Sequence, residues 1–170
     1  MRALTYQGRL LDVDTPVLSS ILSSNQLHIA HALGMIRTTG RRRVGLLGLS
    51  FKEGTDDLRE SPIVTLAELL IGKGYELLVY DRNVRLASLV GANRDYILNH
   101  IPHIGRLMLD RPEQLIEQSE VLVVASADRE FASLLEKLPL DKSVIDLVGA
   151  WSTDPSARSA HLGAYEGIAW

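Results

Sequence analysis

Cysteine is missing from all 170 residues of the chain. Its absence excludes disulfide bonds, thiolate zinc sites and a cysteine nucleophile within this sequence. A protein that needs no disulfides fits the reducing cytoplasm, and we expect a cytoplasmic location on that basis.

Long apolar runs and a strong excess of one charge are also missing. The longest apolar runs, such as residues 121–125, are far too short to cross a bilayer. Residues 1–6 show no apolar segment of the secretory type, so we expect them not to belong to a signal peptide. The net charge is −3 and the isoelectric point is near 5.9. We therefore expect neither nucleic acid nor a membrane surface as a partner.

The composition that remains is typical of a folded soluble protein, with 46% hydrophobic and 23% charged residues. The length allows one globular domain and a little more. We divide the chain into a linking and dimerisation helix with its lead-in, residues 1–40, and a C-terminal domain, residues 41–170.

Residues 16–39 are expected to form one long helix. Pro16 suits a first helical turn, Asp14 or Thr15 can cap it, and Gly40 can end it. Apolar residues recur from Val17 onward at approximately helical spacing, and so small a domain cannot cover this stripe. A symmetric partner, and hence a homodimer through this helix, is expected.

Two features near this helix have simple interpretations. His28 and His31 lie one turn apart, but no third metal ligand is evident, so a helix face at an interface is favoured over a metal site. Arg41–Arg43 is most simply a solvated charge run before a strand.

Strands and helices then alternate. We expect strands at 44–49, 75–80, 121–125 and 143–148, helices at 62–71, 84–90, 112–118 and 129–138, a loop at 151–160 and a short edge strand at 167–170. Residues 91–103 give no firm assignment. Alternation of this kind predicts an α/β fold with a doubly wound, Rossmann-like parallel sheet, preceded by the long helix. Ligands bind such sheets at the carboxyl ends of the strands.

The loop after the first strand, residues 48–62, is the most chemically informative segment. It leads into a helix N-terminus, where free N–H groups favour an anion. Lys52 lies near enough to reach a phosphate or carboxylate, and Arg59 offers a bidentate fork. The G-x-G-x-x-G fingerprint and the P-loop are both absent, so a dinucleotide is not expected to bind here in the usual way.

This loop closely resembles the signature of the UDP-glucose/GDP-mannose dehydrogenase family. The matching residues are Phe51 and Lys52, followed by Thr55, Asp56, Asp57, Arg59, Ser61 and Pro62. The strand that ends at Val79-Tyr80-Asp81 and the order of elements also fit, so that the resemblance covers essentially the whole chain.

The resemblance implies an oxidoreductase that converts the sugar C6 alcohol of a nucleotide sugar into a carboxylate with two NAD molecules and a catalytic cysteine. Family members have an N-terminal NAD-binding domain, a dimerising helix and a C-terminal nucleotide-sugar domain. Residues 2–4 resemble the segment just after the cysteine motif. Catalytic residues are therefore expected upstream of residue 1, NAD is expected to bind mainly to the missing domain, and this chain is expected to be inactive alone.

The resemblance assigns three site residues. Lys52 matches a lysine that contacts the nucleotide sugar, Phe51 lines the same pocket, and Arg59 matches an arginine that reaches the NAD. Asp56 and Asp57 are expected to shape the loop and pair with Arg59. The alternatives are a solvated Lys52, an Arg59 that serves only as a helix-capping ion pair, and a Phe51 that packs in the core.

The loop and the tail Gly167-Ile168-Ala169-Trp170 most resemble the GDP-mannose branch, although that branch is expected to carry cysteine at position 169. This branch oxidises GDP-mannose to GDP-mannuronate in four electrons and supplies alginate-type polysaccharide biosynthesis. The alternatives are the UDP-glucose branch, a stand-alone nucleotide-sugar-binding module and a dimerisation unit. Trp151 and Trp170 are expected to be packing residues.

Overall fold

The computed structural model describes residues 2–50, 52, 54–84, 86, 88–135, 138–139, 141–150 and 164–168. Phe51, the 151–160 loop with Trp151, Ala169 and Trp170 lie outside the described residues. In the described part of the chain, no helix is both long and apolar enough to cross a membrane.

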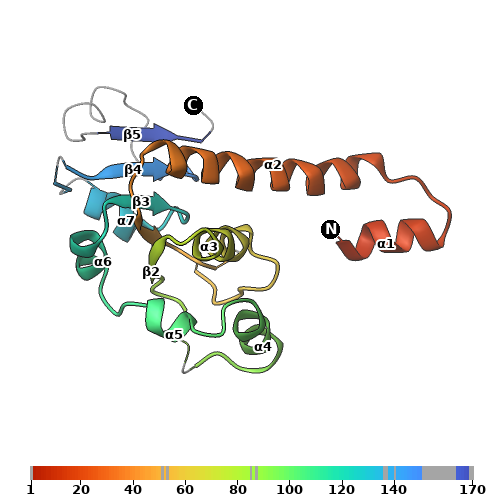
Figure 1. Cartoon of the computed structure of the whole chain (residues 1–170). Helices are drawn as coiled ribbons and strands as arrows, with labels where there is room; N and C mark the ends of the chain where they lie inside the picture. Colours follow the sequence, from red (N-terminus) through yellow and green to blue (C-terminus); the bar gives the residue numbers. More distant parts are fainter. Residues whose placement is uncertain are drawn as a thin grey trace.

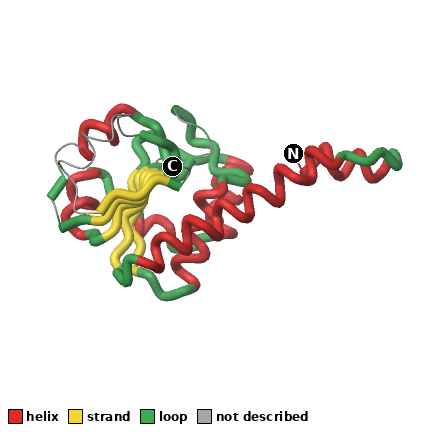
Figure 2. The backbone as a smooth tube through the Cα atoms, turned by 90° about the horizontal axis from the view of Figure 1, so that it is seen from above, coloured by secondary structure: helices red, strands yellow, loops and turns green. Residues whose placement is uncertain are grey.

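Two helices form an arm that projects from the body. Helix α2 (Pro16–Thr38) runs outward from the sheet, and α1 (Arg2–Leu10) folds back beside it (Figures 1 and 2). Only the inner end of α2 belongs to the core, through Ala32, Met35 and Ile36. The long helix is confirmed, and Gly40 follows its end with a positive φ of 67°.

Residues 2–10, expected only as a lead-in, form a helix of their own. The turn behind them packs tightly against Gly8, because a Cβ there would lie 2.9 Å from Cγ2 of Thr15. Thr15 occupies the position before α2 but makes no side-chain capping bond. Tight packing in this turn, rather than a cap, therefore accompanies the reversal of the chain.

All the described strands pair in parallel in one sheet, with the order β2-β1-β3-β4-β5. Their bounds are β1 (Arg43–Leu47), β2 (Glu76–Tyr80), β3 (Val121–Val124), β4 (Ser143–Asp146) and β5 (Ala164–Gly167). The predicted parallel sheet is confirmed. The edge strand expected at 167–170 lies earlier, at 164–167.

Helices cover both faces of the sheet. On one face lie α2, α3 (Pro62–Gly72), α4 (Gly91–His100) and α5 (Ile104–Leu107); on the other lie α6 (Pro112–Gln118) and α7 (Arg129–Leu135). Alternate residues of each strand feed the two cores: Leu46 and Val123 pack with the first group, Leu47 and Val124 with the second. This is the predicted doubly wound arrangement, since the short apolar runs are buried on both faces.

The prediction of a helix at 84–90 is wrong. Its described residues form turns and irregular backbone, although Val84 and Leu89 are buried. Helix α4 occupies 91–100 instead, within the stretch 91–103 that gave no firm assignment, and α5 follows at 104–107. The apolar spacing of residues 84–90 therefore reflects burial of a loop against the core, not a helical face.

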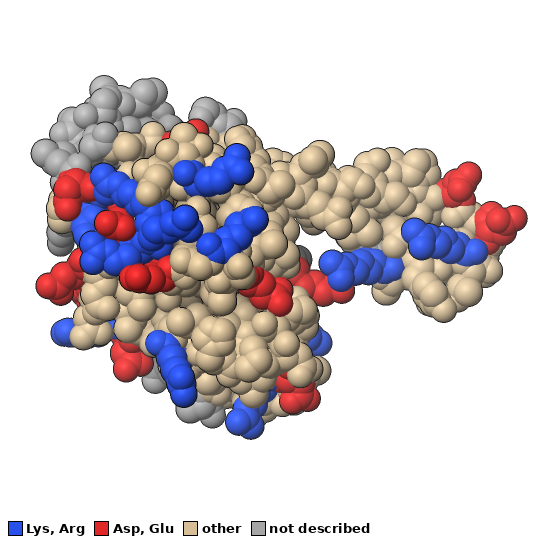
Figure 3. Space-filling model, in the orientation of Figure 1, with Lys and Arg blue, Asp and Glu red and all other residues tan. Residues whose placement is uncertain are grey.

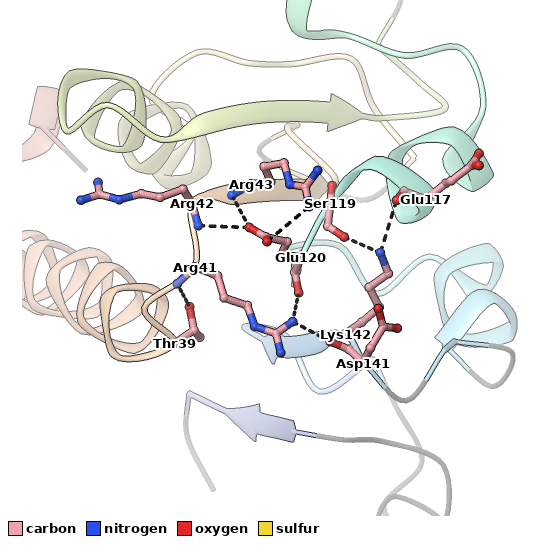
Figure 4. A network of polar contacts seen from close by, with 9 residues as sticks. All are labelled: Thr39, Arg41, Arg42, Arg43, Glu117, Ser119, Glu120, Asp141 and Lys142. Carbon is pink, nitrogen blue, oxygen red and sulfur yellow. Dashed lines mark hydrogen bonds and ion pairs between the residues drawn. The ribbon is translucent and has the colours of Figure 1, made fainter.

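The prediction that Arg41–Arg43 is a solvated charge run is also wrong in part, because these residues form an ordered network of hydrogen bonds and ion pairs (Figure 4). The Glu120 carboxylate accepts the backbone N–H of Arg42 and of Arg43 and pairs with the Arg43 guanidinium at 3.3 Å. Arg41 donates to the backbone carbonyl oxygens of Glu120 and Asp141. The network joins the end of α2 to the amino ends of β1, β3 and β4, on the face where Figure 3 shows basic and acidic side chains gathered.

Glu120 should make stability depend on pH. Hydrogen bonds from the backbone and side chain of Arg43 lower its pKa below the ordinary 4.5. A depressed pKa adds stability above the ordinary value, and this contribution is lost as pH falls through the folded-state pKa. Glu120→Gln should therefore lower the urea midpoint near neutral pH, and the deficit should shrink in acid, as the pH falls through the folded-state pKa of Glu120. Glu117→Gln, at an exposed neighbour, should show neither effect; an equal deficit near neutral pH and in acid would refute the assignment.

Candidate functional site

The loop after β1 lies at the point where the chain direction across the sheet reverses. From β1 the chain crosses to β2 on one side, and it later returns to β3 on the other. Gly48 stands at this switch point with φ 96°, and a Cβ there would lie 2.7 Å from Cβ of Ser126 in the loop after β3. Glycine is required at this position because the two loops touch. Sheets of this kind bind their ligands in the crevice at the switch point.

Asp81 holds the start of the loop. Its side chain follows β2 and is 7% exposed. Oδ2 accepts the N–H of Leu49 at 2.8 Å and that of Ser50 at 3.0 Å, while Oδ1 accepts the N–H of Asn83 at 2.9 Å. The Asp81 carboxylate thus accepts the backbone N–H groups of the first residues after β1. A residue at the end of β2 therefore fixes the path of the loop that follows β1.

Ser61 holds the end of the loop. Its hydroxyl is fully buried, donates to the carbonyl of Leu49 at 2.9 Å and accepts the N–H of Ile63 at 3.2 Å. The second bond caps α3, as the Ser-Pro pair predicts. The first bond ties the two ends of the loop together, and the loop is therefore closed at its base.

Lys52 leaves this loop from a fixed backbone position. Its carbonyl accepts the hydroxyl of Ser50 at 3.1 Å and both the N–H and the hydroxyl of Thr55, at 3.2 and 2.8 Å. The side chain is exposed. An ammonium on an anchored backbone is accessible to an anion arriving from solvent or from another domain.

Arg59 and Asp57 form a two-pronged pair. The Nε of Arg59 donates to Oδ1 at 2.9 Å and one terminal nitrogen donates to Oδ2 at 3.0 Å. This side-chain hydrogen bond lowers the pKa of Asp57, and the Lys52 charge adds to the effect. The pairing expected from the sequence is confirmed for Asp57, which stays ionised and is unsuited to act as a general acid near neutral pH.

Arg59 faces the arm across a cleft of about 900 Å³. Asp57, Arg59 and Glu60 line it from the loop, and Arg2 and Arg9 line it from α1. Arg2 lies 3.8 Å from the Glu60 carboxylate. Lys52 is not among the described residues that line this cleft, so the structure does not bring the two expected ligand-binding cations to one pocket.

Asp146 shapes the loop after β4. It is fully buried, and its Oδ1 accepts the N–H groups of Val148, Gly149 and Ala150 at 3.0, 2.8 and 3.2 Å. The Tyr165 hydroxyl donates to Oδ2 at 2.7 Å and links this loop to β5. Asp146 thus organises its own loop, while Asp81 organises the loop of its neighbour.

A second, larger cavity of about 1230 Å³ lies beside the end of β2. Tyr80 lines it and donates to the Glu130 carboxylate at 3.2 Å. Burial, reinforced by Glu130, raises the pKa of Tyr80 to about 12, so that the hydroxyl keeps its proton at physiological pH. Among the described residues, no group of three histidine or acidic side chains is placed to hold a metal ion.

Sequence reasoning missed Asp81, Asn93 and Asp146, which hold the loops after β1 and β4. Asp81 carried a usable signal, since an acidic residue directly follows an apolar strand. Asp146 lay within an expected strand, and Asn93, which contacts the middle of the loop, lay in the unassigned stretch. Their partners are fixed only by the tertiary fold.

Comparison with known proteins identifies the family. Residues 45–153 match the family model described as the UDP-binding domain of the UDP-glucose/GDP-mannose dehydrogenase family. The chain belongs to the UDP-glucose/GDP-mannose dehydrogenase family. The resemblance carried by the loop at 48–62 is thereby confirmed, and the chain is a member of an enzyme family.

Within this dehydrogenase family, the GDP-mannose 6-dehydrogenase of Pseudomonas syringae pv. tomato is 48% identical over 170 residues, which make up 100% of this chain and 38% of that protein. The crystal structure of a ternary complex of GDP-mannose dehydrogenase from Pseudomonas aeruginosa superposes with a TM-score of 0.84 at 46% identity, covering 99% of this chain and 37% of that one. A UDP-glucose dehydrogenase from Pyrobaculum islandicum is more distant, at 26% identity, a TM-score of 0.70 and coverage of 99% and 35%.

The chain thus spans little more than a third of the length of these dehydrogenases and corresponds to their C-terminal part. The GDP-mannose relatives match over its full length, including the arm, whereas the family model starts within β1. The arm is therefore shared with whole GDP-mannose enzymes and not an isolated addition.

Proposed function

We propose that this chain is the nucleotide-sugar-binding part of a NAD-dependent GDP-mannose 6-dehydrogenase, an enzyme that oxidises GDP-mannose to GDP-mannuronate in four electrons. The observation that carries the proposal is the loop at 48–62, whose backbone is tied down at both ends while Lys52 and Arg59 remain exposed. The higher identity to GDP-mannose enzymes favours GDP-mannose over UDP-glucose.

In this proposal Lys52 neutralises phosphate or developing carboxylate charge on the nucleotide sugar, and Phe51 lines the same pocket. Arg59 reaches a phosphate of NAD across the cleft. An exposed ion pair contributes little to stability, so the pair with Asp57 is better explained as orienting the Arg59 fork than as capping α3. The two cations then serve two ligands, which agrees with their separation in the structure.

We assign different roles to the two parts of the chain. Residues 41–170 form the nucleotide-sugar-binding domain, and residues 1–40 link and dimerise. The chain has no cysteine, so it contributes binding groups and no thiol nucleophile, and alone it is inactive. NAD is bound mainly by the N-terminal part of such an enzyme. The setting we propose is cytoplasmic synthesis of an alginate-type polysaccharide.

We also propose that the arm forms a homodimer. Large apolar side chains lie on its surface, with exposed fractions of 72% for Leu11, 72% for Val17 and 71% for Leu27. The inner end of α2 is packed on the sheet, and the outer part projects away from the body (Figure 1). A second copy of the same arm is the partner that covers such a surface symmetrically.

A calorimetric titration of GDP-mannose tests the role of Lys52. Lys52→Ala should weaken binding by about tenfold or more, since a hydrogen-bonded charge pair with phosphate is lost. Lys73→Ala is the matched control, because this exposed lysine follows α3 at the opposite end of the sheet. Equal affinity of wild type and Lys52→Ala would remove Lys52 from the site.

A further inference from the structure

Asn93 connects helix α4 to the middle of the loop at 48–62. Its side-chain Oδ1 accepts the N–H of Leu58 at 2.8 Å, and its Nδ2 donates to the carbonyl of Asp56. The Asn93 side-chain amide thus pairs with one backbone N–H and one backbone carbonyl of the loop, as the main chain of a neighbouring β-strand would.

The residue between these two bonds is Asp57. Its flanking peptide groups are clamped by Asn93, and the side chain of Leu58 is fully buried in the core below. Asp57 is therefore held at the apex of the loop, where its carboxylate receives both prongs of Arg59 and the backbone N–H of Arg59 at 3.1 Å. The direction of the Arg59 guanidinium therefore depends on the position of Asp57.

The clamp is separate from the anchors at the ends of the loop. Asp81 holds residues 49 and 50, and Ser61 ties its own position to residue 49. Asn93 contacts residues 56 and 58, within the segment that leads to Arg59. Loss of the clamp therefore releases the apex while the base of the loop stays closed.

We propose that Asn93 is the positioning residue for Arg59: it fixes the main chain on both sides of Asp57, and Asp57 in turn aims the Arg59 fork into the cleft toward a diphosphate-bearing nucleotide. The choice of ligand rests on the proposed function. The positioning itself is a property of the chain and is measurable without ligand.

Nuclear magnetic resonance of the full chain measures this positioning. In Asn93→Ala, the Leu58 amide should exchange with solvent about tenfold faster or more, and the Arg59 Nε–H signal should move toward that of an unpaired arginine. Asn99→Ala, at an exposed asparagine of the same helix, should leave both signals unchanged. Unaltered Leu58 exchange together with an unaltered Arg59 signal in Asn93→Ala overturns the proposal.

A titration with NAD separates this proposal from the proposed function. Asn93→Ala should weaken NAD binding about as much as Arg59→Ala does. If Arg59→Ala binds NAD as wild type does, the cofactor role of Arg59 fails, and the Arg59 Nε–H signal still decides the role of Asn93. If Asn93→Ala does not fold, Asn93→Asp keeps the acceptor for Leu58 and removes the donor to Asp56; a wild-type Arg59 signal in that variant overturns the positioning role.

Discussion

Replacing Asp146 with alanine should lower the free energy of unfolding by about 3 kcal/mol or more. The carboxylate is fully buried and accepts three backbone N–H groups and the Tyr165 hydroxyl. Without it the three half-buried backbone N–H groups lose this acceptor, and a hydrogen-bonding group left unsatisfied inside the protein costs about 1–3 kcal/mol. Urea unfolding followed by circular dichroism measures the change.

The control for this prediction is Asp141→Ala, at an exposed aspartate just before β4. Its side chain is on the surface, so the variant should unfold within about 0.5 kcal/mol of wild type. Asp146→Asn keeps one carbonyl acceptor and should fall between wild type and Asp146→Ala. A loss below about 1 kcal/mol for Asp146→Ala would show that water satisfies the loop after β4 as well as the carboxylate does.

Placing charge on the arm should abolish self-association. In the double variant Val17→Glu and Leu27→Glu, two carboxylates replace two of the most exposed apolar side chains, and burying them unpaired in a dimer is strongly unfavourable. We expect the dissociation constant to rise by at least about 100-fold, so that sedimentation velocity shows a monomer where wild type is a dimer.

Val90→Glu is the matched control, because Val90 is 78% exposed and precedes α4, outside the two helices of the arm. It should leave the dimer unchanged. A wild-type chain that stays monomeric at high concentration would contradict the proposed dimer, and an unchanged dimer in the double variant would place the interface elsewhere.

The sheet was predictable because its signal is local. Short apolar runs without alternation are typical of parallel strands covered on both faces, and such runs became β1, β3 and β4. The cap of α3 was predictable for the same reason, since Ser61 and Pro62 carry it themselves. The family of the loop was recognisable because its polar residues stand in a fixed order.

Features that depend on distant contacts were not predictable. Helix α4 buries Ile97 but is largely polar, so periodicity gave no signal for it. Asn93 meets Leu58 across 35 positions of sequence, and Arg41 meets Asp141 across 100. The sequence alone predicts that Arg41–Arg43 is solvated, because Glu120, which pairs with these residues in the fold, lies far along the chain.

The central claim is that the chain recognises the GDP-mannose class of nucleotide sugar, and parallel calorimetric titrations with GDP-mannose and UDP-glucose test it most directly. The account predicts tighter binding of GDP-mannose, by about tenfold or more, since a difference of 1.4 kcal/mol in binding free energy corresponds to about tenfold in affinity. Equal affinity for the two ligands, or tighter binding of UDP-glucose, would contradict it.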